Sequence, residues 1–217
     1  MDRAELLELL SPEGLRLLDS LPRWTGRDQV VQAVSRLRKE GHSAGVVAAA
    51  LTQSRLRARA EAKFGPFAER MLFTEAGLEQ ATRLRVAAQH AGRFDAAGLR
   101  RVADLGCGIG GDALAMAAID LHVTAVEADE VTAAIAAYNL TPFAHAEVVH
   151  ADAASVPLDD VDAAWLDPAR RRTEQGTTTR LSDAADYSPS LDTVFAIAQR
   201  MPVGVKLGPG TDRDVIP

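Results

Sequence analysis

This chain has a single cysteine, no long apolar run and no start that resembles a secretory signal. Cys107 is the only cysteine among 217 residues, which excludes an internal disulfide and a cysteine-rich zinc site. No apolar run reaches the roughly 18 residues that a membrane-spanning helix needs, and residues 1–5 lack the basic and apolar regions of a secretory signal. The five histidines have no metal-ligand spacing. We therefore expect a cytoplasmic protein without a membrane segment or a metal.

The charge of the chain, −6 in total, is unevenly divided along the sequence. Residues 1–100 hold 16 basic and 12 acidic side chains, a net charge of +4, whereas residues 101–217 hold 8 and 18, a net charge of −10. This asymmetry indicates two parts with different roles. The acidic part would repel RNA unless local basic residues or the first part compensated.

The first part has the pattern of a helical domain. Ser11, Pro12 and Glu13 supply an N-cap residue, a proline at the first helical position and an acid in the first turn. Further helices are predicted over 29–39, 43–64 and from Thr74 to about Arg93. We expect a helical N-terminal domain over residues 1–95.

From Arg100 onward, short apolar runs alternate with helical stretches. The runs that we expect to be strands span 102–105, 123–126, 146–149, 163–166 and 203–207. Such alternation predicts a parallel sheet with right-handed crossovers, here a Rossmann-like α/β core over residues 96–217. Ligands of such sheets bind outside the carboxyl ends of the strands. The polar or glycine residues that follow the strands should converge there, namely Gly106, Glu127, Asp152 and Asp167.

The glycines after the first strand form a nucleotide-cofactor loop that two cofactor classes share. Gly106, Gly108 and Gly111 fit the dinucleotide pattern G-x-G-x-x-G, so an oxidoreductase is one alternative. Asp104 favours S-adenosylmethionine instead, because a carboxylate there can hold the methionine ammonium and would repel a pyrophosphate. Asp152 after the third strand suits a carboxylate that accepts from the adenine amino group.

The segments 104–112, 126–129, 150–152 and 166–168 resemble successive motifs of class I methyltransferases, and the resemblance covers about residues 70–210. It implies S-adenosylmethionine as the cofactor. The fold that it implies normally has two more strands after the fifth, so we expect a sheet truncated there. The cofactor-binding residues predicted in this way are Thr74, Asp104, Gly106, Gly108, Gly110, Asp112, Glu127, Asp152 and Ala153.

Two subfamilies share further features with the chain. Residues 73–75 and 108–111 are similar to segments of trimethylguanosine synthases, which methylate the exocyclic amine of guanine in RNA. The whole chain looks still more like the bacterial THUMP-like-domain methyltransferases, whose helical N-terminal region has a segment like residues 63–74. This resemblance implies RNA, either tRNA or rRNA, as the partner.

Asp167 and Pro168 follow the fourth strand, where class I enzymes that act on amino groups often have an Asp/Asn-Pro-Pro-aromatic motif. We expect both to be catalytic: the carboxylate orients the amine and the proline makes the turn rigid. Arg170 replaces the aromatic residue, and it could stack on a base, clamp a phosphate or simply face solvent. With Arg171 and Lys206, Arg170 completes the predicted substrate-binding set, although an ordinary lysine at the end of the sheet is the simpler interpretation of Lys206.

Asp-Pro-Ala-Arg also resembles a motif of RNA 5-methyluridine methyltransferases, which need a cysteine nucleophile. Cys107 lies inside the cofactor loop, on the wrong side of the methyl group, so this mechanism is not expected for the chain alone. Arg55, Arg59 and Lys63 share a helix face, which could follow phosphates or be an ordinary solvated face. The predicted function is methylation of an RNA base. The alternatives are a small-molecule or protein methyltransferase and a non-catalytic RNA-binding protein that retains cofactor affinity.

Overall fold

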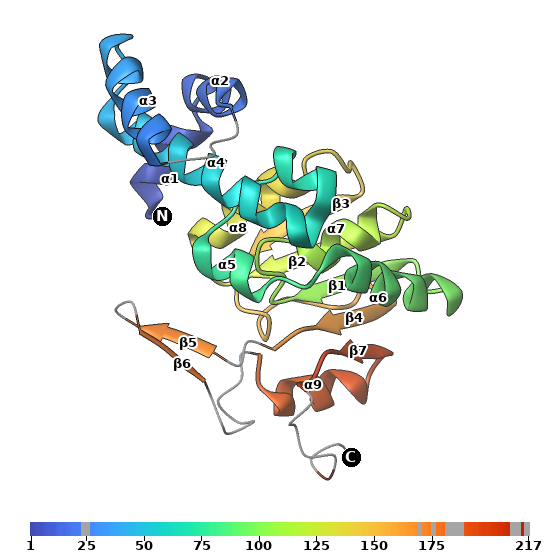
Figure 1. Cartoon of the computed structure of the whole chain (residues 1–217). Helices are drawn as coiled ribbons and strands as arrows, with labels where there is room; N and C mark the ends of the chain where they lie inside the picture. Colours follow the sequence, from blue (N-terminus) through green and yellow to red (C-terminus); the bar gives the residue numbers. More distant parts are fainter. Residues whose placement is uncertain (23–26, 169–170, 175–176, 181–188, 209–213, 215–217) are drawn as a thin grey trace.

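The computed structural model describes residues 1–22, 27–168, 171–174, 177–180, 189–208 and 214. Helices form one end of the molecule and a parallel sheet with flanking helices forms the other, as Figure 1 shows. Among the described helices, none combines the length and the apolar character that crossing a bilayer requires.

The N-terminal part contains the helices α1 (Arg3–Leu10), α2 (Pro12–Ser20), α3 (Arg27–Lys39) and α4 (Ala44–Phe64). Side-chain oxygens of Asp2, Ser11 and Ser43 accept from backbone N–H groups at the starts of α1, α2 and α4. The expected starts at Ser11 and Ser43 are therefore confirmed. Gly65 ends α4 with a φ of 55°, a conformation that glycine adopts without the steric cost of a Cβ.

The segment after α4 departs from the expected single helix over 74–93. A 3-10 turn, η1 (Gly65–Arg70), leads to the short α5 (Glu75–Gln80), and α6 (Leu84–Ala96) follows after a break. Helical periodicity continues through the break, so the sequence pattern alone gave no sign of it. The expectation of one helix was wrong because the backbone between Gln80 and Leu84 is extended, with ψ 138° at Ala81 and 134° at Arg83.

The expected parallel sheet is confirmed. Its strand order is β3-β2-β1-β4-β7, and all neighbouring strands are parallel. The strands are β1 (Arg101–Leu105), β2 (His122–Glu127), β3 (Ala146–His150), β4 (Ala163–Leu166) and β7 (Val203–Val205). The helices α7 (Gly111–Ala117), α8 (Glu130–Leu140) and α9 (Leu191–Ala198) connect them. The fold is therefore a Rossmann-like α/β fold with helices before the sheet.

Each face of the sheet has its own hydrophobic cluster. Ala103 and Leu105 of β1 belong to the cluster that α9 covers, whereas Val102 belongs to the other. That second cluster runs without interruption from Leu6 of α1 to Trp165 of β4. Burial of the N-terminal helices and burial of one sheet face are thus parts of a single packing arrangement.

Two buried amides fix the extended residues between η1 and α5. Gln53 of α4 donates to the carbonyl of Phe73 at 2.7 Å and accepts from its N–H at 3.0 Å. Asn139 of α8 makes the same pair of bonds to Leu72, at 3.0 and 2.7 Å, and also donates to the carbonyl of Ile109 at 2.9 Å. This segment therefore reaches the glycine loop in a defined position.

An antiparallel hairpin that the sequence analysis did not predict lies between β4 and α9. Its strands are β5 (Arg171–Glu174) and β6 (Thr177–Arg180), and Figure 1 shows it projecting away from the parallel sheet.

Candidate functional site

A cavity of about 630 Å³ lies at the carboxyl edge of the sheet. Residues that follow β1, β2, β3, β4 and β7 line it, together with the segment that runs from Thr74 to Thr82. Eleven of the predicted site residues contribute to its lining: Thr74, Asp104, Gly106, Gly108, Asp112, Glu127, Asp152, Ala153, Asp167, Pro168 and Lys206.

The glycine loop after β1 bends back toward β2. The N–H groups of Gly106 and Cys107 both donate to the carbonyl of Val126 at 2.9 Å. Gly106 and Gly108 have φ values of 83° and 57°, in the left-handed region that other residues rarely adopt. A Cβ at Gly108 would meet no atom within 4 Å, so the space above this residue is open to a ligand.

Gly110 has a different environment from the other glycines of the loop. A Cβ there would lie 3.6 Å from Leu140 and 3.7 Å from Ala136, both on α8. Gly110 is the N-cap of α7 with a φ of 82°, and it is not among the residues that line the cavity. The turn into α7, with its positive φ, explains why this position is a glycine.

Asp104, the last but one residue of β1, is 2% exposed, and its Oδ2 has no hydrogen-bond partner. Burial raises the pKa of this carboxyl well above its usual range, and the neighbouring Asp112 and Asp167 add to the effect. A buried carboxylate oxygen without a partner is costly. Asp104 therefore favours a cationic ligand group that would donate to it.

Glu127 and Asp152 have carboxylates of fixed orientation. Glu127 accepts from the N–H of Gly108 at 3.0 Å and from that of Asp129 at 2.9 Å. Asp152 accepts from the N–H of Ala154 at 2.8 Å. Each carboxylate oxygen has two lone pairs, so both side chains keep accepting capacity for hydroxyl or amino groups of a ligand. Ala153 lines the cavity beside Asp152.

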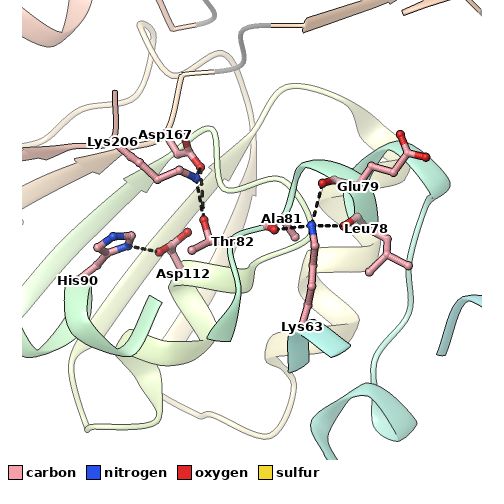
Figure 2. A network of polar contacts seen from close by, with 9 residues as sticks. All are labelled: Lys63, Leu78, Glu79, Ala81, Thr82, His90, Asp112, Asp167 and Lys206. Carbon is pink, nitrogen blue, oxygen red and sulfur yellow. Dashed lines mark hydrogen bonds and ion pairs between the residues drawn. The ribbon is translucent and has the colours of Figure 1, made fainter. Parts of the chain in front are cut away.

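Asp112 is held by a side chain on another helix. Its Oδ1 makes a hydrogen bond of 2.7 Å with Nδ1 of His90 on α6, which Figure 2 shows. The imidazole in turn lies over Trp165, with ring centroids 4.3 Å apart. Asp112 thus lines the cavity from a fixed position.

At the other end of the cavity, Asp167 and Lys206 form an ion pair through Oδ2 and Nζ, drawn in Figure 2. The ammonium also donates to Oγ1 of Thr82 at 2.9 Å, and this hydroxyl lies 3.4 Å from the same carboxylate oxygen. The backbone N–H of Lys206 donates to the carbonyl of Leu166 at 2.9 Å. Pro168 follows directly and also lines the cavity.

The three cations of the basic stripe on α4, Arg55, Arg59 and Lys63, each have partners within the protein, while the side chains of Arg55 and Arg59 stay 61% and 44% exposed. Arg55 and Arg59 both pair with Glu75 of α5, and Arg59 also lies 3.9 Å from Glu79. The ammonium of Lys63 donates to three backbone carbonyls. Burial lowers the pKa of Lys63, and the charges of Arg83 and Lys206 lower it further.

Several lining residues had no signal in the sequence. Thr82 and Pro189 line the cavity, but neither belongs to a recognisable motif.

Two predicted substrate-binding arginines cannot be placed at the site. Arg170 lies outside the described residues, and of Arg171 the structure describes only the backbone, at the start of β5. Burial raises the pKa of the Cys107 thiol well above its usual range, which disfavours the thiolate that a nucleophilic cysteine needs. Within the described ranges, no group of three or more potential ligands could hold a metal ion.

These residues fit S-adenosylmethionine. Asp104 has a buried oxygen without a partner for the methionine ammonium, Gly108 leaves open space over the loop, and Glu127 keeps acceptor capacity for ribose hydroxyls. A pyrophosphate fits poorly, because six acids line the cavity and Lys206 is the one lysine or arginine among its described lining residues. The oxidoreductase alternative has no support here.

Comparisons with known proteins agree with this geometry. Residues 103–169 match a family model described as a methyltransferase domain, and residues 2–60 match a domain of unknown function, DUF8688. No curated protein matched the chain. A putative methyltransferase from Porphyromonas gingivalis W83 has the same fold, with a TM-score of 0.66 and 22% identity over 92% of this chain and 50% of that chain.

A putative RNA methyltransferase from Pyrococcus horikoshii is similar with a TM-score of 0.48 and 17% identity, over 71% of this chain and 74% of that chain. The chain spans half the length of the Porphyromonas gingivalis protein. The match of residues 103–169 to a methyltransferase domain supports S-adenosylmethionine as the cofactor.

Proposed function

We propose that the protein transfers the methyl group of S-adenosylmethionine to a nitrogen of a base in RNA. One observation carries this proposal: a single cavity joins Asp104, Glu127 and Asp152 to the Asp167–Lys206 pair. The first three side chains suit the cofactor, and the pair lies where an acceptor amine would meet the methyl group.

The residues of the chain would act mainly by positioning. The bound cofactor supplies a methyl group that its sulfonium has already activated. Asp104 would accept from the methionine ammonium, Glu127 from ribose hydroxyls and Asp152 from the adenine amino group. Holding both reactants in line lowers the barrier by replacing an encounter in solution with a fixed geometry.

Asp167 would orient the acceptor amine and receive its proton. Lys206 holds this carboxylate through an ion pair with its Oδ2. Thr82 donates to the same oxygen and so limits its rotation. The acceptor nitrogen loses one proton as it gains the methyl group, and a fixed carboxylate in contact with that N–H can take the proton.

RNA as the acceptor rests on the resemblance to RNA-modifying families and on the arginines beside the site. Residues 170–172 are all arginine, and they follow Pro168 closely along the chain. An acidic cavity repels phosphates, so basic residues at its mouth would be needed to hold a polynucleotide.

Tritiated methyl transfer tests the proposal. The protein would be incubated with labelled S-adenosylmethionine and with total RNA, protein and metabolite fractions from cells that lack it. Label in RNA that is lost with Asp167→Ala and kept with Asp160→Asn supports the proposal, because Asp160 is an exposed acid away from the cavity. Label in another fraction would redirect the substrate class. Cofactor binding by calorimetry with no label in any fraction would indicate a non-catalytic protein.

A further inference from the structure

The segment between α4 and α6 forms one wall of the cavity. A lysine from α4 makes hydrogen bonds to the C-terminal end of this wall. Six residues of this wall contribute to the lining besides Thr74: Ala76, Gly77, Glu79, Gln80, Ala81 and Thr82. None of them belongs to the methyltransferase domain model, which begins at residue 103. The N-terminal part of the chain therefore supplies a side of the site.

Lys63 uses all three of its ammonium protons on this wall. Its Nζ donates to the carbonyls of Leu78, Glu79 and Ala81 at 2.8, 2.7 and 2.8 Å, as Figure 2 shows. The last carbonyls of a helix have no partner within the helix, and a cation there also interacts well with the helix dipole. Lys63 thus stabilises the end of α5 and the extended backbone that follows.

This break in the helix presents Thr82 to the acceptor end of the cavity. Thr82 is 8% exposed, and its hydroxyl contacts both members of the Asp167–Lys206 pair. The carbonyl of Ala81, which Lys63 holds, belongs to the peptide unit that leads directly into Thr82. A change in the position of that peptide would move the hydroxyl.

The opposite end of the wall is fixed without Lys63. Thr74 caps α5 by accepting from the N–H of Gly77 at 2.9 Å, and Gln53 makes both of its bonds to the backbone of Phe73. Gly77 packs so closely on the glycine loop that a Cβ there would lie 2.5 Å from Cγ2 of Ile109. Loss of Lys63 should therefore disturb the acceptor end more than the cofactor end.

We propose that Lys63 is a positioning residue for methyl transfer, which fixes Thr82 against the Asp167–Lys206 pair through the carbonyls of the α5–α6 connection. This inference rests on the proposed function. It also assigns a role to the N-terminal helices, because α4 carries Lys63 to the site from outside the methyltransferase domain.

The variant Lys63→Met removes the ammonium and keeps an unbranched side chain of similar length. Arg55→Met is the matched control, since Arg55 lies two turns earlier on the same helix face and its side chain is 61% exposed. With total RNA as acceptor, we expect Lys63→Met to lower kcat by about 10-fold or more, in line with the cost of a small misplacement at a reacting centre. The KM for RNA and the Kd for S-adenosylmethionine should change by less than about threefold, and Arg55→Met should change none of the three by more.

Amide hydrogen exchange supplies a readout that needs no acceptor. In Lys63→Met, amides of residues 78–83 should exchange faster while those of the sheet stay protected, and Arg55→Met should match the parent protein. Lys63→Ala adds a rescue test, in which propylammonium in the buffer should restore part of kcat. This arm also keeps the inference testable if Lys63→Met proves poorly folded.

Three results would overturn the inference. The first is unchanged exchange at residues 78–83, and the second is faster exchange with an unchanged kcat. The third is a raised KM for RNA at constant kcat, which would make Lys63 a phosphate contact. If the parent protein labels no RNA, the proposed function fails, and the exchange comparison still decides whether Lys63 fixes this segment.

Discussion

Nδ1 of His90 and Oδ1 of Asp112 lie 2.7 Å apart, and both side chains are about nine-tenths buried. The two residues come from different helices, α6 and α7, and Asp112 reaches the cavity while His90 lies over Trp165. This bond connects the aromatic packing under the sheet to one wall of the cofactor cavity.

His90→Leu should lower the free energy of unfolding by about 1–3 kcal/mol, because it leaves the buried carboxylate of Asp112 without its partner. His122→Leu is the control, since His122 is exposed at the start of β2 and should cost much less. Urea denaturation of both variants measures the difference. Equal losses would show that the His90–Asp112 bond contributes nothing specific.

Asp104→Asn should separate stability from cofactor binding. The free protein should be at least as stable as the parent, because the substitution removes a buried ionisable group whose Oδ2 has no partner. Binding of S-adenosylmethionine should weaken about 10-fold or more, since an amide cannot supply the carboxylate charge to the ammonium. Thermal denaturation and calorimetry measure the two quantities. Unchanged affinity would exclude Asp104 from the ammonium site.

Cofactor affinity should rise with pH in a range set by Asp104. Burial raises the pKa of this carboxyl, so the free protein keeps a proton there at pH values where an exposed aspartate has lost it. Binding of the ammonium must release that proton, and the Kd should therefore fall by about tenfold per pH unit below the raised pKa. Calorimetry in buffers of different ionisation enthalpy measures the released proton.

The same shift has an opposite effect on the stability of the free protein. Because the pKa of Asp104 is higher in the folded than in the unfolded protein, its contribution to stability is fully present below the unfolded pKa. This contribution is lost as the pH rises through the folded pKa.

The pH dependence of cofactor affinity should disappear in Asp104→Asn. A dependence that persists in this variant would point to another group.

Gly108→Ala and Gly98→Ala make a matched pair at the cofactor loop. Both glycines have positive φ values, 57° and 73°, and at both a Cβ would meet no atom within 4 Å. Each variant should lose about 1–2 kcal/mol of stability through backbone strain. Only Gly108→Ala should also weaken cofactor binding, because Gly108 lines the cavity. Equal affinities in calorimetry would place the cofactor away from Gly108.

The sequence predicted the parts of the site that depend on strand ends. Asp104, Glu127, Asp152 and Asp167 each follow from a short apolar run and the polar residue at its end, and parallel topology brings such residues to one edge. The glycine loop was equally readable, because positive φ values restrict the choice of residue.

The parts that sequence reasoning missed depend on tertiary contacts. The break before Thr82 interrupts a continuous helical pattern. Its stabilising partner, Lys63 of α4, lies 15 to 18 residues before the carbonyls that it binds. Lys63 had been grouped with Arg55 and Arg59 by spacing alone, and spacing does not reveal that Glu75 and backbone carbonyls take up their charges. Pairing across such distances leaves no periodic signal.

The uninterrupted hydrophobic cluster from Leu6 to Trp165 has a consequence for how the protein melts. Elements that share one core lose their packing together, so the N-terminal helices and the sheet should unfold in one transition, with coinciding midpoints by far-ultraviolet circular dichroism and tryptophan fluorescence. A shortened chain that starts at residue 96 would expose the apolar side of β1 and β4, and it should aggregate or require a substitute cover.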